Sequence, residues 1–148
     1  MPNNRLSYLT ANDWILIAAR ARRRTFKLGE EIIRQGSAGD RIYVLRKGEA
    51  VVKLTITSKE SVLATLGPED ICGDMAFLEK GPATATVVAN DYEVEADEIT
   101  ADDLRALFES FPRLASRFYM SLAVVLARRL RDTSRELART LEFSRPRS

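Results

Sequence analysis

Hydrophobic and polar residues alternate through the middle of the chain, from about residue 25 to residue 100. The clearest run is Ala50–Ile56, in which every second side chain is apolar and can face a core. Val62–Leu66 and Thr84–Ala89 repeat this alternation, and turns rich in glycine separate the runs. Short strands at this spacing predict a mainly β fold, an antiparallel sandwich or jelly-roll-like barrel.

Helical patterns flank the predicted strands at both ends. Thr10 and Asp13 have the spacing of a capping box and predict an N-terminal helix over about residues 10–22. Thr100 and Asp103 repeat that spacing, and Pro112 suits the first turn of a longer helix. We therefore expect C-terminal helices over 101–142, the last of them about 45 Å long.

Two hydrophobic stripes run along the predicted last helix. The stripe in its first half can pack on the barrel: Leu114, Phe118, Leu122 and Val125. A neighbouring stripe continues through its second half: Leu126, Leu130, Leu137 and Leu141. Because the second half extends beyond any single small core, we expect a symmetric homodimer through this C-terminal helix. The alternative is a surface helix that folds back on its own domain.

The amino-acid composition excludes several kinds of functional site. The 148 residues are 45% hydrophobic and 30% charged, which fits one globular domain over 1–148. A single cysteine, Cys72, excludes an internal disulfide and a cysteine-based zinc site, and its apolar neighbours predict burial. The absence of histidine removes histidine-ligated metals and histidine general bases. We expect no enzyme activity, no cofactor and no membrane segment, and a cytoplasmic location.

The net charge of +2 does not by itself indicate a nucleic-acid or membrane partner. Arginines nevertheless cluster at Arg20–Arg24 and again between Arg113 and Arg147. The first cluster is either a phosphate-binding patch or a solvated helix end, and the favourable interaction of cations with a helix C-terminus favours the second interpretation.

The segment Ile71–Ala89 combines a Gly73-Asp74 turn, a short apolar stretch, a Gly81-Pro82 break and a strand. A helix that starts after a glycine presents backbone N–H groups that suit an anion such as a phosphate. The Asp74 carboxylate can accept hydrogen bonds from sugar hydroxyls.

The order of these elements resembles the cyclic nucleotide-binding domain family, which includes catabolite activator proteins, regulatory subunits of cyclic-AMP-dependent kinase and nucleotide-gated channels. Residues 73–78, Gly-Asp-Met-Ala-Phe-Leu, resemble the start of the family's phosphate-binding cassette, and residues 82–87, Pro-Ala-Thr-Ala-Thr-Val, resemble its end. Residues 127–134, Ala-Arg-Arg-Leu-Arg-Asp-Thr-Ser, resemble the long helix of the catabolite activator branch. The resemblance implies these ligand-binding positions: Gly73, Asp74, Met75, Ala76, Ala83, Thr84, Thr133 and Ser134.

Two of these positions depart from the family pattern. The family has glutamate at Asp74, where it accepts the ribose 2′-hydroxyl, and arginine at Ala83, where it pairs with the cyclic phosphate. Loss of that arginine contact costs roughly 1.5–3 kcal/mol, or about 10- to 150-fold in affinity. Lys80 is an alternative source of positive charge. Thr133 and Ser134 fall where the family contacts adenine, the second from the partner subunit.

Three functions remain open from the sequence. The first is a regulatory module that binds a cyclic nucleotide, cyclic AMP in preference to cyclic GMP, and signals through its dimeric helix. The second is a degenerate domain that keeps the fold for dimerisation or protein interaction and binds no cyclic nucleotide, which Ala83 favours. The third is the sensor part of a truncated transcription regulator, although no helix-turn-helix domain is expected within these residues.

Overall fold

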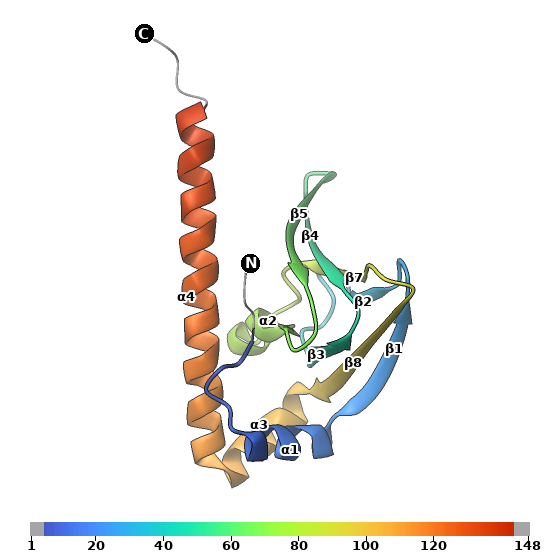
Figure 1. Ribbon diagram of the computed structural model, residues 1–148, viewed down its shortest axis with the longest axis vertical. Helices are drawn as coiled ribbons and strands as arrows, with labels where there is room; N and C mark the ends of the chain where they lie inside the picture. Colours follow the sequence, from blue (N-terminus) through green and yellow to red (C-terminus); the bar gives the residue numbers. More distant parts are fainter. Residues whose placement is uncertain (1–4, 144–148) are drawn as a thin grey trace.

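The computed structural model describes residues 5–143 as two four-stranded antiparallel sheets with helices against one side (Figure 1). The strand order is β1-β8-β3-β6 in the first sheet and β2-β7-β4-β5 in the second. The strands are β1 (Arg22–Lys27), β2 (Glu31–Ile33), β3 (Arg41–Lys47), β4 (Ala50–Ile56), β5 (Lys59–Leu66), β6 (Ile71–Cys72), β7 (Thr86–Ala89) and β8 (Glu93–Thr100). The predicted antiparallel sandwich is thus confirmed. Residues 1–4 and 144–148, which include Arg147 of the second arginine cluster, lie outside the described residues.

Buried side chains form two clusters, one on each face of the first sheet. Alternate residues of β3 serve both: Tyr43 and Leu45 pack between the sheets, and Ile42 packs toward the helices. The alternation of side chains along a strand explains this division. Cys72 is buried between the sheets, as its apolar context predicts.

The N-terminal helix α1 (Ala11–Arg20) begins with the predicted capping box. Thr10 accepts a hydrogen bond from the Asp13 backbone, and the Asp13 carboxylate accepts one from the Thr10 backbone. The same carboxylate accepts two hydrogen bonds from Arg117, at 2.6 and 2.8 Å. One buried acid therefore caps α1 and fastens it to the last helix.

The interpretation of Arg20–Arg24 as a solvated helix end is wrong for most of the cluster. Only Arg20 lies in the last turn of α1, because β1 starts at Arg22. Arg23 donates to Asp97 at 2.7 Å and Arg24 donates to Glu98 at 2.8 Å, both across the β1–β8 pair. Opposite charges on neighbouring strands stabilise the pairing, so these arginines belong to the sheet.

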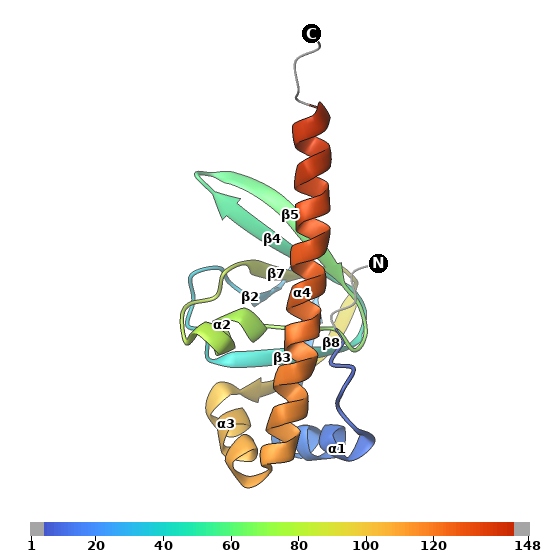
Figure 2. The ribbon, with the colours of Figure 1, turned by 90° about the vertical axis from the view of Figure 1, so that its left-hand side faces the viewer.

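Two helices follow the strands: α3 (Ala101–Ser110) and the 32-residue α4 (Pro112–Phe143). The predicted first stripe of α4 is buried against the domain: Leu114, Phe118, Leu122 and Val125. From Leu130 to Phe143 every residue is exposed. Figures 1 and 2 show this half of α4 rising past the sheets. Within residues 5–143, no helix combines the length and apolar character needed to cross a membrane.

Candidate functional site

The turn before the short helix α2 (Asp74–Glu79) depends on glycine. Gly73 follows β6 with a φ of 86°, in the left-handed region that favours glycine. A Cβ at this position would lie 2.5 Å from the backbone carbonyl oxygen of Arg41, so the strand behind the turn also excludes a side chain. The sequence-predicted strand, turn and single short helix are confirmed at this point.

Asp74, the first residue of α2, is buried, with 3% of its surface exposed. Its Oδ2 atom lies 3.1 Å from a guanidinium nitrogen of Arg129, which donates a hydrogen bond from α4. The Arg129 side chain remains 29% exposed. The carboxylate at the start of the cassette therefore already has a cationic partner from a residue 55 positions later in the sequence.

Burial raises the pKa of the Asp74 carboxyl above its usual value, and the Arg129 charge and hydrogen bond act in the opposite direction. The Arg129 guanidinium stabilises the charged form of the Asp74 carboxylate in a site that disfavours an isolated charge. An incoming ligand with both hydroxyl and phosphate groups would meet an acceptor and a cation side by side.

At the other end of the cassette, position 83 carries an alanine and therefore no charge. Ala83 is buried, and its backbone is fully engaged: its N–H donates to Ser37 at 2.9 Å, and its carbonyl accepts from Gly36 at 2.8 Å. Thr84 is exposed beside it. Lys80, the alternative cation, is exposed at the C-terminal end of α2.

The remaining predicted positions fall into two groups. Ala76 is buried within α2, and Met75 is 40% exposed beside Asp74. Thr133 and Ser134 are exposed on the outer half of α4, beyond the part of the helix that packs on its own domain. The structure thus brings Gly73, Asp74, Met75 and Ala76 together in one turn and leaves the two α4 residues on an open surface.

Arg129 is the residue that sequence reasoning did not single out. The signal for it is helical spacing: Phe118, Leu122 and Val125 are buried on α4, and position 129 continues the same face. An arginine that continues a buried stripe has its head group directed at the domain surface, where it can meet an acid.

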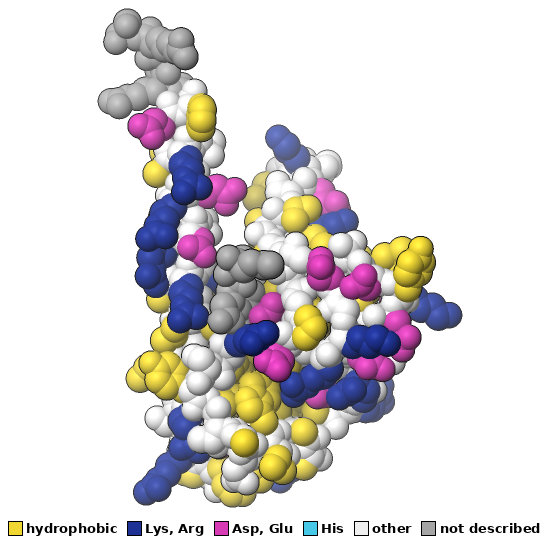
Figure 3. All heavy atoms as spheres, viewed as in Figure 1, with side chains coloured by type: hydrophobic (Ala, Val, Ile, Leu, Met, Phe, Trp, Pro, Cys, Tyr) yellow, Lys and Arg dark blue, Asp and Glu magenta, His cyan; other side chains and the backbone are white. Residues whose placement is uncertain are grey.

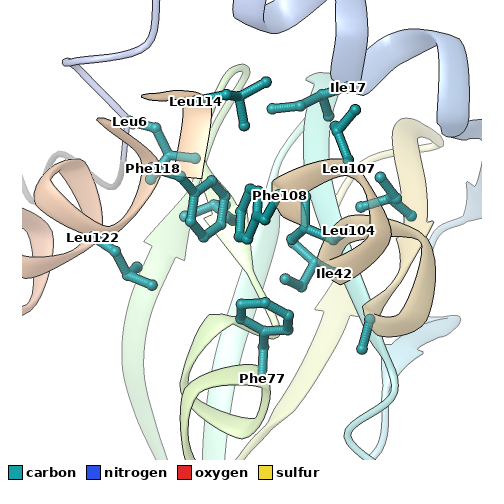
Figure 4. Packing of buried hydrophobic residues seen from close by; sticks show 13 residues of the cluster. Leu6, Ile17, Ile42, Phe77, Leu104, Leu107, Phe108, Leu114, Phe118 and Leu122 are labelled. Carbon is teal, nitrogen blue, oxygen red and sulfur yellow. The ribbon is translucent and has the colours of Figure 1, made fainter. Parts of the chain in front are cut away.

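Phe77 of α2 connects the cassette to the helices. Its ring centroid lies 6.1 Å from that of Phe118 on α4 and 6.3 Å from that of Phe108 on α3, both in edge-to-face geometry. Figure 4 shows Phe77 below these two rings at the centre of the helix-side cluster. The cassette therefore touches α4 through an apolar contact as well as through the Asp74–Arg129 pair.

The fold and this cassette agree with comparisons to known proteins. The family model described as cyclic nucleotide-binding domain matches residues 23–111, more than half of the chain. The chain belongs to the cyclic nucleotide-binding domain family. The resemblance in the order of elements and in the cassette is thereby confirmed.

Relatives of this domain occur in bacteria and eukaryotes. The cyclic AMP receptor protein of Thermus thermophilus is 34% identical over 119 residues, which cover 78% of this chain and 51% of that protein. Cyclic GMP-binding protein C of Dictyostelium discoideum is 31% identical over 142 residues, or 90% of this chain and 5% of that protein. The crystal structure of the Thermus thermophilus catabolite activator protein superimposes with a TM-score of 0.75 at 32% identity, over 91% of this chain and 61% of that one.

Proposed function

We propose that this domain is a regulatory sensor that binds a cyclic nucleotide, cyclic AMP in preference to cyclic GMP, between its cassette and α4. The contact that supports this proposal is the Asp74–Arg129 hydrogen bond at 3.1 Å. Arg129 puts a cation next to the cassette carboxylate. The cassette itself has Ala83 at the position where the family has an arginine.

In this proposal Asp74 accepts a hydrogen bond from the ribose 2′-hydroxyl, directly or through a water. Arg129 supplies the positive charge for the cyclic phosphate, together with the backbone N–H groups at the start of α2. Arg129 lies on α4, so a bound ligand either replaces the hydrogen bond between Asp74 and Arg129 or adds its own contacts to that pair. Ligand binding then favours one arrangement of α4 over another, which is the requirement for a switch.

We also propose a homodimer through the outer half of α4. In the described structure this half exposes Leu130, Leu137 and Leu141, with 57–70% of their surfaces accessible. Arginine side chains gather along its outer edge (Figure 3). A partner helix against the leucines would bring Thr133 of one subunit and Ser134 of the partner subunit close to the cassette, where they can contact the base.

The alternative function is a degenerate domain that uses the same helix for dimerisation and binds no cyclic nucleotide. Two observations favour it: the apolar Ala83 and the pairing of the buried Asp74 with Arg129. If that pair only holds α4 in place, the cation that remains in the cassette is Lys80, which is exposed at the far end of α2 from Asp74.

Calorimetric titration with cyclic AMP and cyclic GMP separates the two functions. The sensor proposal predicts saturable binding of cyclic AMP, tighter than that of cyclic GMP, and a loss of about 10- to 150-fold in affinity for Arg129→Gln. Arg128→Gln, the exposed neighbour on α4, is the matched control and should keep wild-type affinity. Absence of heat and of thermal shift at millimolar ligand would establish the degenerate function.

A further inference from the structure

A hollow of about 750 Å³ opens between α2 and α3, at the opposite end of α2 from Asp74. Its walls are the loop 36–40 with Arg41 at the start of β3, the loop 80–82, the start of α3 at 100–102, and Arg105. In Figure 2 these segments meet at the left-hand edge of the molecule. The volume lies within the range of small-molecule sites, and none of the eight residues predicted to bind a cyclic nucleotide lines it.

Close packing and backbone hydrogen bonds fix these walls. A Cβ on Gly39 would lie 2.2 Å from the Gly81 carbonyl oxygen, so the two loops touch with no space for a side chain. The Asp40 carbonyl accepts a hydrogen bond from the Ala101 backbone at 2.8 Å, which joins the first loop to α3. The hollow is therefore formed before any ligand arrives, and binding there requires little ordering of the chain.

Three cations line the hollow: Lys80, Arg105 and Arg41. Lys80 forms no ion pair with any residue that the structure describes. Arg105 lies 3.6 Å from Asp102, whose side chain is 99% exposed, and its guanidinium is held 5.1 Å from the centre of the Phe77 ring. Arg41 reaches Glu98 only at 3.4 Å. Arg24 and the Tyr43 hydroxyl already donate to the same carboxylate at 2.8 and 2.7 Å.

Two carboxylates, Asp40 and Asp102, stand among these cations at the hollow. An anion with no hydrogen-bond donor would be repelled by them, whereas a ligand with hydroxyl groups can donate to them. The cations can bind a phosphate group, and the carboxylates can accept hydrogen bonds from hydroxyl groups. A ligand that suits this hollow therefore carries both kinds of group on one small molecule. We propose that this hollow is a second ligand site, which binds a small sugar phosphate with its phosphate near Lys80 and Arg105.

This site is independent of the cyclic nucleotide proposal, because that proposal rests on Asp74 and Arg129 and neither residue lines the hollow. The test is a calorimetric titration of the full chain with ribose 5-phosphate, and with ribose and inorganic phosphate as separate arms. Ribose 5-phosphate should bind at millimolar concentration or below, more tightly than either fragment, and more weakly as salt is added.

Four variants locate the binding. Lys80→Gln and Arg105→Gln should each weaken ribose 5-phosphate binding roughly tenfold or more, because each removes a charged contact. Lys59→Gln, which removes the same charge at the exposed tip of the β4–β5 hairpin, should bind as the wild type does. Asp74→Asn, which alters the cyclic nucleotide site, should also leave this binding unchanged.

Several outcomes would overturn the second site. They are no saturable binding to the wild type, equal binding of inorganic phosphate alone, or equal effects of Lys80→Gln and Lys59→Gln. Loss of binding in Asp74→Asn with retention in Lys80→Gln would place the sugar phosphate in the cassette and would also overturn the proposal. A failed cyclic AMP titration leaves all these comparisons intact.

Discussion

Arg129 of α4 donates a hydrogen bond to Asp74 of α2 at 3.1 Å, one residue before the part of α4 in which every described residue is exposed. Below it, Arg117 holds Asp13 of α1 with two hydrogen bonds. From Leu130 to Phe143 every residue of α4 is exposed. The helix is thus fixed along one half, and its cassette contact sits at the boundary between the fixed and the exposed half.

The Asp74–Arg129 pair should stabilise the folded domain. Arg129→Gln leaves a buried carboxylate without its cation, and we expect the free energy of unfolding to fall by about 1–3 kcal/mol. Asp74→Asn combined with Arg129→Gln should cost less than the sum of the single changes. Urea unfolding followed by the fluorescence of Trp14 measures this coupling, and Arg128→Gln should change stability by less than about 0.5 kcal/mol. A coupling free energy indistinguishable from zero would contradict a direct interaction.

Ala83→Arg tests whether the cassette retains its shape for a cyclic phosphate. If it does, the added guanidinium should raise cyclic AMP affinity by about 10- to 150-fold. Asn90→Arg, which adds the same charge on the exposed turn after β7, is the control for a general electrostatic effect. Calorimetry on both variants gives the comparison, and equal affinities would show that Ala83 does not face the phosphate.

The outer half of α4 should carry the dimer interface. Leu137→Glu places a charge in the exposed leucine stripe, so the variant should sediment as a monomer at concentrations where the wild type is a dimer. Ala138→Glu places the same charge about 100° around the helix and should have a smaller effect. A chain cut after Leu130 should also be monomeric. If both altered chains sediment with the wild type, the interface lies elsewhere.

Acid should weaken the junction between α1 and α4. The hydrogen bonds from Arg117 lower the pKa of Asp13 to about 2, against opposing desolvation. A lowered acid pKa gives stability that is present above the ordinary value near 3.8 and lost as the pH falls toward 2. With allowance for the partly exposed arginine, Asp13→Asn should cost about 1–2 kcal/mol at neutral pH and less near pH 2. Urea unfolding at several pH values measures the free energy of unfolding of the wild type and of Asp13→Asn. If the difference between them were the same at every pH, this pair would have no such role.

Gly39 should be irreplaceable by alanine. The added Cβ would lie 2.2 Å from the Gly81 carbonyl oxygen and 2.4 Å from the Ala76 Cβ, so the two loops would have to separate. We expect a loss of about 1–3 kcal/mol in the free energy of unfolding. Gly67→Ala, where nothing lies within 4 Å, is the matched control and should be close to neutral. Equal urea midpoints for the two variants would contradict this packing argument.

Local patterns in the sequence determined the elements of this protein. The strand over Ala50–Ile56, the Thr10–Asp13 capping box and the Gly73 turn each depend on neighbours within a few residues, and each is present. The apolar face predicted for that strand is fully buried only at Ala50; Val52 and Leu54 are partly buried, and Ile56 is 64% exposed. The cassette could be placed for the same reason, because a glycine turn and a following helix start are encoded side by side. The family was predicted from the order of these elements.

Only the tertiary structure decided which charges meet. Arg129 and Asp74 are 55 positions apart, and Arg24 and Glu98 are 74 apart. A solvated arginine and a paired one look alike in sequence, since the difference is whether an acid from another element comes within hydrogen-bond distance. The hollow beside Lys80 likewise exists only because two loops, which touch at Gly39 and Gly81, lie against the start of α3. Long-range contacts of this kind depend on how the two sheets and α4 pack, which no local pattern specifies.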